Sequence, residues 1–165
     1  MPKNFGAKMS TLKQAANEFL SLKRIAVAGV SRKGDTAANA IYKKLKNCGY
    51  EVFPINPNAE EIDGDKCYHN LNEIPEMVEG VVIGTKPEAA KQIVEDCGKL
   101  GIKDIWIHRS FGNGSYDESA IEKAKELGLK VIPGGCPLMF CEPVDVAHKC
   151  FRWFFGATNK LPKYV

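Results

Sequence analysis

The stretch Arg24–Thr36 has the residue types and spacing of an anion-binding turn. An apolar, β-branched run ends at Gly29, a polar turn follows, and a helical pattern begins near Asp35. The first amide groups of a helix have no partner within it, and the helix dipole is positive at that end. A phosphate is therefore the natural ligand of this turn. Gly29, Ser31 and Gly34 read G-x-S-x-x-G, which only partly matches the dinucleotide fingerprint G-x-G-x-x-G.

Three side chains help to predict which nucleotide this turn would bind: those of Arg32, Lys33 and Asn56. Arg32 and Lys33 stand in the turn, so its charge suits a ligand with several phosphates, such as coenzyme A (CoA); the alternative is an exposed loop with solvated cations. An NAD-binding domain usually has Asp or Glu at the end of the second strand, where it accepts hydrogen bonds from the ribose hydroxyls. Asn56, followed by Pro57, holds that position here, which counts against NAD(H).

The elements that must position these residues alternate between apolar runs and amphipathic patterns. We predict strands at 24–30, 50–55, 79–85, 104–108 and 129–132. We predict helices at 36–47, 87–99 and 117–127, with an N-terminal helix at 10–22 and an aromatic C-terminal helix at 143–156. An irregular acidic loop is expected after the second strand.

Short buried strands that alternate with helices are typical of a parallel sheet covered on both faces. Right-handed crossovers then give an α/β fold, a Rossmann-like doubly wound parallel sheet of about five strands in three αβα layers. The chain of 165 residues fits one domain, over residues 1–165. Ligands of such sheets bind outside the carboxyl ends of the strands. The residues that follow the five strands are Val30–Gly34, Asn56–Asn58, Thr85–Pro87, His108–Ser110 and Pro133–Cys136.

Six stretches, in order along the chain, together carry a resemblance to a known family. They are Ile25–Ser31, Gly49–Pro57, Cys67–Pro75, Ile105–Ile107, Gly128–Ile132 and Gly135–Phe140. In these stretches the chain resembles the stand-alone CoA-binding domain proteins, which are related to the CoA-binding N-terminal domain of the succinyl-CoA synthetase α subunit. The resemblance implies a Rossmann-like fold that binds CoA across the ends of the first three strands.

Carried over by position, the resemblance also implies the residues of the site. The phosphates would be held by Gly29, Val30, Ser31, Arg32, Lys33 and the helix start Thr36. Ile55, Asn56 and Pro57 would wall the adenosine side, and Thr85, Lys86 and Pro87 would line the other side, towards the pantetheine. Residues 58–63 depart from this pattern because they are acidic where a cation for the 3′-phosphate would be welcome. Arg32, Lys33 or Lys86 must then supply that cation.

Cysteines and histidines offer further chemistry. The six cysteines contain no Cys-x-x-Cys pair, and Cys136, Cys141, His148 and Cys150 match no common structural zinc spacing, so we predict no metal site. Cys136, beside two glycines, could form a mixed disulfide with the CoA thiol; the alternative is a packed cysteine. His108 could hydrogen-bond a ligand, although a strand-end histidine satisfied by backbone is the plainer interpretation. His69 is expected to be a solvated residue of the acidic loop.

Charge and hydropathy narrow the function. The net charge of +3 is too small to imply a nucleic-acid partner, and no apolar run approaches the roughly 20 residues of a membrane span, so we expect a cytoplasmic protein. No catalytic triad, acid pair or metal triad is visible. We predict a module that binds CoA or acyl-CoA, or regulates through it, without catalysis of its own. An NAD(H)-binding redox protein and a non-catalytic subunit of an acyl-CoA ligase remain alternatives, and the aromatic segment 151–155 is a possible contact with a second copy or another protein.

Overall fold

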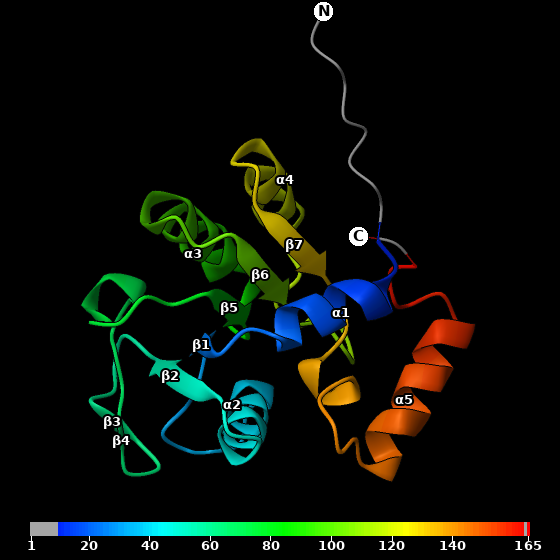
Figure 1. Cartoon of the computed structure of the whole chain (residues 1–165), viewed down its shortest axis with the longest axis horizontal. Coiled ribbons are helices and arrows are strands. Elements are labelled where there is room, and N and C mark those ends of the chain that lie inside the picture. Colours follow the sequence, from blue (N-terminus) through cyan, green and yellow to red (C-terminus); the bar gives the residue numbers. More distant parts are fainter. Residues whose placement is uncertain (1–9, 164) are drawn as a thin grey trace, which may run out of the picture.

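The computed structural model describes residues 10–163 and 165 and contains a five-stranded parallel sheet between two layers of helices (Figure 1). The strands are β1 Arg24–Ala28, β2 Glu51–Ile55, β5 Gly80–Ile83, β6 Asp104–Ile107 and β7 Lys130–Pro133. They lie in the order β2-β1-β5-β6-β7, and all neighbours pair in parallel. The chain thus leaves β1 towards β2 on one side and later returns to β5 on the other, which places the switch point of the sheet between β1 and β5.

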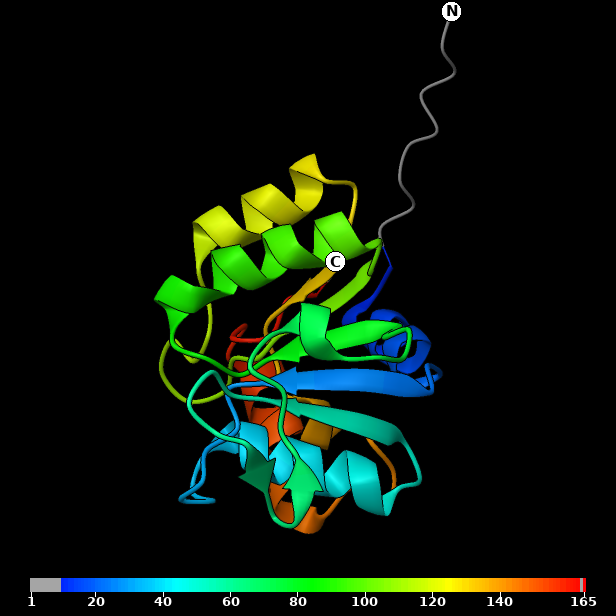
Figure 2. The ribbon, with the colours of Figure 1, turned by 90° about the vertical axis from the view of Figure 1, so that its left-hand side faces the viewer.

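Helices cover both faces of this sheet (Figures 1 and 2). One face packs against α1 Leu12–Leu20, α2 Ala37–Asn47, the 3-10 turn η2 Pro137–Met139 and α5 Val146–Ala157. The other face packs against α3 Pro87–Leu100, α4 Glu118–Glu126 and the 3-10 turn η1 Leu71–Glu73. Alternate side chains of β1 divide between these two cores, as the two-residue period of a strand requires.

The predicted fold class, sheet and layers are therefore confirmed. The first strand ends two residues earlier than predicted, at Ala28, because Gly29 adopts a φ of 98° that turns the chain out of the sheet. The predicted single domain 1–165 includes residues 1–9 and 164, which lie outside the described part of the chain. Its extent stays a prediction.

The prediction of an irregular acidic loop after β2 is wrong. That segment contains a small antiparallel hairpin, β3 Glu61–Ile62 and β4 Asp65–Lys66. Asp63 and Gly64 form its turn with φ angles of 52° and 85°, the conformation for which Asp-Gly is favoured. Tyr42 and Lys46 of α2 both bond to Asp65, and so hold the hairpin against that helix.

Two glycines bring the ends of β1 and β5 unusually close together. A Cβ on Gly29 would lie 2.3 Å from the carbonyl oxygen of Gly84. A Cβ on Gly84 would lie 2.9 Å from the Cβ of Ala38 in α2 and 3.2 Å from the carbonyl oxygen of Ala28. Backbone and helix therefore meet at distances that leave no room for side chains at these two positions.

We predict that Gly84→Ala lowers the free energy of unfolding by about 1–3 kcal/mol, the usual cost of overpacking a close contact. Gly156→Ala is the matched control, because an added Cβ there meets nothing within 4 Å. In helix α5 that change should raise the stability by up to about 1 kcal/mol. Urea denaturation measures both, and equal effects of the two substitutions would contradict the close approach.

Candidate functional site

A cleft of about 630 Å³ opens at the carboxyl ends of β1, β2 and β5, at the switch point of the sheet. This volume falls in the range of small-molecule sites. Most of the residues predicted for the site line it, namely Gly29, Val30, Ser31, Thr36, Ile55, Asn56, Pro57, Thr85 and Lys86. Arg32, Lys33 and Pro87 belong to the same loops but are not part of its lining. Hence three loops far apart in sequence meet around one hollow.

The loop between β1 and α2 is held in shape by Asn39, a residue that the sequence reasoning missed. Its side chain is 1% exposed and bonds Ser31 twice: the Ser31 amide donates to Oδ1 at 2.8 Å, and Nδ2 donates to the Ser31 carbonyl at 2.8 Å. Thr36 caps α2 by accepting a bond from the Asn39 amide at 3.2 Å. A threonine cap followed three residues later by a polar side chain was the available signal.

This loop ends where α2 begins, and there the site can hold an anion. The amides of Ala37 and Ala38 have no acceptor within the helix, since they precede its first complete turn. The helix dipole adds partial positive charge at the same end. Thr36 lines the cleft, so a phosphate that enters it meets the start of α2.

Asn56 joins the loops after β1 and β2. Its Nδ2 donates to the carbonyl oxygen of Val30 at 2.6 Å, and its Oδ1 accepts the amide of Asn58 at 2.7 Å. Both ends of the carboxamide are thus occupied by the protein. At the position where a dinucleotide-binding domain presents a free carboxylate, this chain has a structural bridge.

The loop after β5, which also lines the cleft, is held by a hydrogen bond from the loop after β6. Ser115, 1% exposed, donates its hydroxyl to the carbonyl oxygen of Thr85 at 2.6 Å. Lys86 follows as the N-cap residue of α3, and its side chain is exposed. Of the described residues that line the cleft, Lys86 is the one lysine or arginine.

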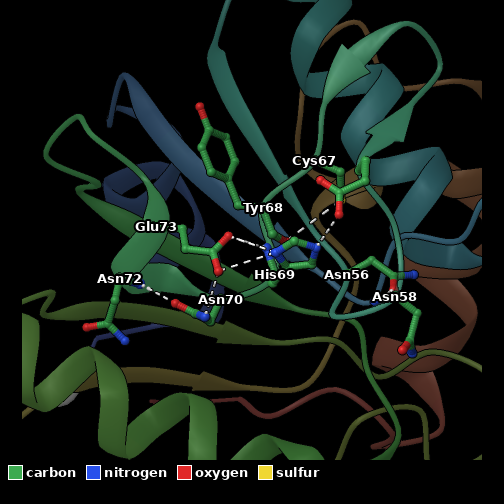
Figure 3. A network of polar contacts seen from close by, with 9 residues as sticks. Asn56, Asn58, Cys67, Tyr68, His69, Asn70, Asn72 and Glu73 are labelled. Carbon is green, nitrogen blue, oxygen red and sulfur yellow. Dashed lines mark hydrogen bonds and ion pairs between the residues drawn. The ribbon is translucent and has the colours of Figure 1, made fainter.

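His69 also lines the cleft, and it belongs to the polar network of Figure 3. Its Nδ1 is 3.0 Å from Oε2 of Glu73, and its Nε2 is 3.0 Å from Oε1 of Glu60. The carboxylate of Glu73, with that of Glu60, holds the pKa of His69 above its ordinary range. His69 is therefore not the freely solvated loop residue that we expected; it links the segment before β3 to η1 and lines the cleft.

Cys136 lies in the hydrophobic core, away from the lining of the cleft. It is 4% exposed and packs on the side of α1 and α5. Burial raises the pKa of its thiol to about 12, which leaves little of the reactive thiolate at neutral pH. The contact with a CoA thiol stays a prediction, and this placement weighs against it.

His108 is buried at the end of β6, with 6% of its surface exposed. Its Nε2 has no hydrogen-bond partner among residues 10–163 and 165, so the interpretation that backbone satisfies the side chain is wrong for that atom. Burial lowers the pKa of His108 from its ordinary 6.5 to about 4. The ring is consequently neutral at physiological pH.

Other kinds of site find no support within the described residues. No group of three or more histidine, cysteine, aspartate or glutamate side chains there is arranged to hold a metal ion. None of the helices in that part of the chain is long and apolar enough to cross a bilayer.

Residues 23–142, which include every strand of the sheet and the whole cleft, match the model of a family described as a CoA binding domain. The chain belongs to this CoA-binding domain family. The predicted resemblance is thereby confirmed.

Relatives of this CoA-binding domain include much larger proteins. The ADP-forming acetate–CoA ligase of Methanocaldococcus jannaschii is 30% identical over 69% of this chain, and the match covers 17% of that protein. The α subunit of ADP-forming acetate–CoA ligase I of Pyrococcus furiosus is 31% identical over 85% of this chain and 32% of the subunit. A solved hypothetical protein from Pyrococcus horikoshii OT3 is 34% identical with a TM-score of 0.73, over 80% of this chain and 91% of its own. The chain thus spans less than a third of these ligases.

Burial of His108 predicts a pH-dependent stability of this CoA-binding domain. The unfolded chain takes up a proton on His108 near pH 6.5, whereas the folded chain does so only near pH 4. Stability therefore rises with pH across this window, by up to about 3 kcal/mol, and this contribution is complete above pH 6.5.

His108→Gln should remove this part of the pH dependence, because glutamine does not titrate. Denaturant unfolding of both proteins from pH 4 upward gives the difference, in which the titrations of the other histidines cancel. Parallel curves for the two proteins would show that His108 titrates normally.

Proposed function

We propose that the protein binds CoA or an acyl-CoA in this cleft, with the pyrophosphate at the loop Gly29–Thr36, as a binding or regulatory module without catalysis of its own. The observation that carries the proposal is that α2 begins at the edge of the cleft, at the switch point of the sheet, after a loop that hydrogen bonds hold in place. Membership of the CoA-binding domain family supports the choice of ligand.

The rest of the ligand follows the walls of the cleft. Adenosine lies along Ile55, Asn56 and Pro57, where an apolar side chain and a proline ring offer flat contacts. The pantetheine passes on the side of Thr85, Lys86 and Pro87. Lys86 is the lysine or arginine of the lining, because Arg32 and Lys33 are exposed outside it. Its side chain would reach from the pantetheine side across the cleft to the 3′-phosphate on the ribose. The cytoplasmic location stays a prediction.

A subunit of an acyl-CoA ligase is the second candidate. Relatives named as ADP-forming acetate–CoA ligases favour it, since the chain matches only a part of each. Such a subunit needs a protein partner, and α5 exposes 75% of Trp153 and 48% of Phe154. An NAD(H)-binding redox protein is disfavoured because both ends of the Asn56 carboxamide are already bonded.

Calorimetric titration of nucleotide-stripped protein tests the proposed ligand. We expect CoA and acetyl-CoA to bind, and NAD and ATP to bind far more weakly, because the end of β2 offers the ribose the bonded carboxamide of Asn56 in place of a carboxylate. Tight binding of NAD without binding of CoA would overturn the proposal. Formation of acetyl-CoA by this chain alone would refute the absence of catalysis.

Lys86→Ala tests the contact with the 3′-phosphate. We expect about a tenfold loss of affinity for CoA, the lower end of what a hydrogen bond to a charged group contributes, and little change for 3′-dephospho-CoA. Lys91→Ala is the matched control, because it removes one exposed charge from the same helix outside the cleft. Equal losses for both ligands would refute the assignment of Lys86.

Affinities of Arg32→Ala for CoA and for 3′-dephospho-CoA show which phosphate, if any, the Arg32 side chain contacts. A loss confined to CoA places Arg32 on the 3′-phosphate, whereas equal losses for CoA and 3′-dephospho-CoA place it on the pyrophosphate or in support of the loop.

A further inference from the structure

Two cysteines outside the cleft lie in direct contact. The sulfurs of Cys48 and Cys141 are 3.7 Å apart, although the residues are separated by 93 positions in sequence. Among the described residues this is the one hydrogen-bonding contact between two sulfurs. A disulfide needs about 2.05 Å, so the two sulfurs must approach by roughly 1.7 Å.

Both backbones are fixed around this pair. Cys48 is the C-cap residue of α2, and its amide donates to the carbonyl oxygens of Lys44 and Leu45. Cys141 follows η2, where its amide donates to the carbonyl oxygen of Pro137 at 2.9 Å. Lys44 of α2 also donates to the carbonyl oxygen of Pro143 at 2.6 Å, across the same junction. The contact between the thiols therefore belongs to a packed junction between two elements.

The pair is open to small reagents from one side. Cys48 is half-buried, Cys141 is 3% exposed, and both line a shallow hollow of about 400 Å³ together with Asn17, Tyr50, Phe140 and Glu142. The Cys141 thiol points at the sulfur of Cys48, and Cys48 in turn contacts the carbonyl oxygen of Glu142 at 3.5 Å. An oxidant would thus reach Cys48 first.

We propose that Cys48 and Cys141 form a dithiol site that small disulfides convert reversibly into an intramolecular disulfide. The thiolate of Cys48 attacks one sulfur of the small disulfide, forms a mixed disulfide and releases one small thiol. Burial raises the pKa of the Cys141 thiol to about 11, so Cys141 reacts as the adjacent thiol: its sulfur attacks the Cys48 sulfur, and its proton passes to the departing small thiolate, which leaves as the second small thiol. One small disulfide gains two hydrogens, two protein S–H bonds are lost, and one S–S bond forms between α2 and the segment after η2.

Equilibration of the full chain with glutathione disulfide, followed by alkylation and mass spectrometry, tests this site. We expect the oxidised chain to carry two fewer alkyl groups than the reduced chain, a cross-linked peptide that contains Cys48 and Cys141, and reversal by dithiothreitol. Free, alkylated Cys48 and Cys141 after this treatment would overturn the proposal, as would a disulfide that joins two chains.

Two variants separate this pair from the other thiols. Cys48→Ser should abolish the intramolecular cross-link, and because Cys48 is half-buried, the substitution leaves the core intact. Cys150→Ser, which removes the exposed cysteine, should leave the cross-link unchanged. Loss of the cross-link in Cys150→Ser would show that the exposed thiol is the reacting group.

Thermal unfolding supplies an independent readout. A disulfide across 93 positions closes a long loop in the unfolded chain, so the oxidised protein should melt at a higher temperature than the reduced one. The difference should vanish in Cys48→Ser. An equal shift in that variant would mean that oxidation acts elsewhere.

Discussion

The close contact between the ends of β1 and β5 is the constraint on which the site depends. Gly29 and Gly84 have no side chains, so the two loops and the start of α2 meet at distances that a Cβ would forbid. Parallel strands already bring their carboxyl ends to one edge of the sheet. Because these two glycines carry no side chain, this edge of the sheet is narrow, and α2 begins beside the cleft, at its N-cap residue Thr36.

Around this contact, several polar side chains form hydrogen bonds with backbone groups of the loops and so are not free to bind a ligand. Asn39 holds Ser31, Asn56 holds Val30, and Ser115 holds Thr85. A rigid wall of this kind keeps amide groups at the helix start in place, so little ordering is needed when an anion binds. Among the described lysines and arginines, Lys86 is the one that lines the cleft, and its side chain is exposed.

Much of this architecture could be read from the sequence, because the alternation of apolar runs and amphipathic patterns reflects local periodicity. The loops after β1, β2 and β5, which line the cleft, were also predictable, since each follows a strand, whereas the part of the lining at His69–Leu71 was not predicted. The hairpin at 61–66 was missed because two-residue strands show no period, although Asp63-Gly64 was a readable turn signal. Other contacts depend on how separate segments pack against one another. These are the two hydrogen bonds between Asn39 and Ser31, the contacts of His69 with Glu60 and Glu73, and the contact between the sulfurs of Cys48 and Cys141. Composition and spacing do not encode this packing.

The segment after the hairpin also covers part of the outer edge of β2. The Tyr68 amide donates to the carbonyl oxygen of Pro54, and the Asn56 amide donates to the carbonyl oxygen of Tyr68, both at 2.9 Å. The outer margin of β2 is thus partly occupied by its own chain, whereas an open margin invites strands from neighbouring molecules. A strand from another molecule would therefore have to displace Tyr68 before it could pair with the carboxyl half of β2.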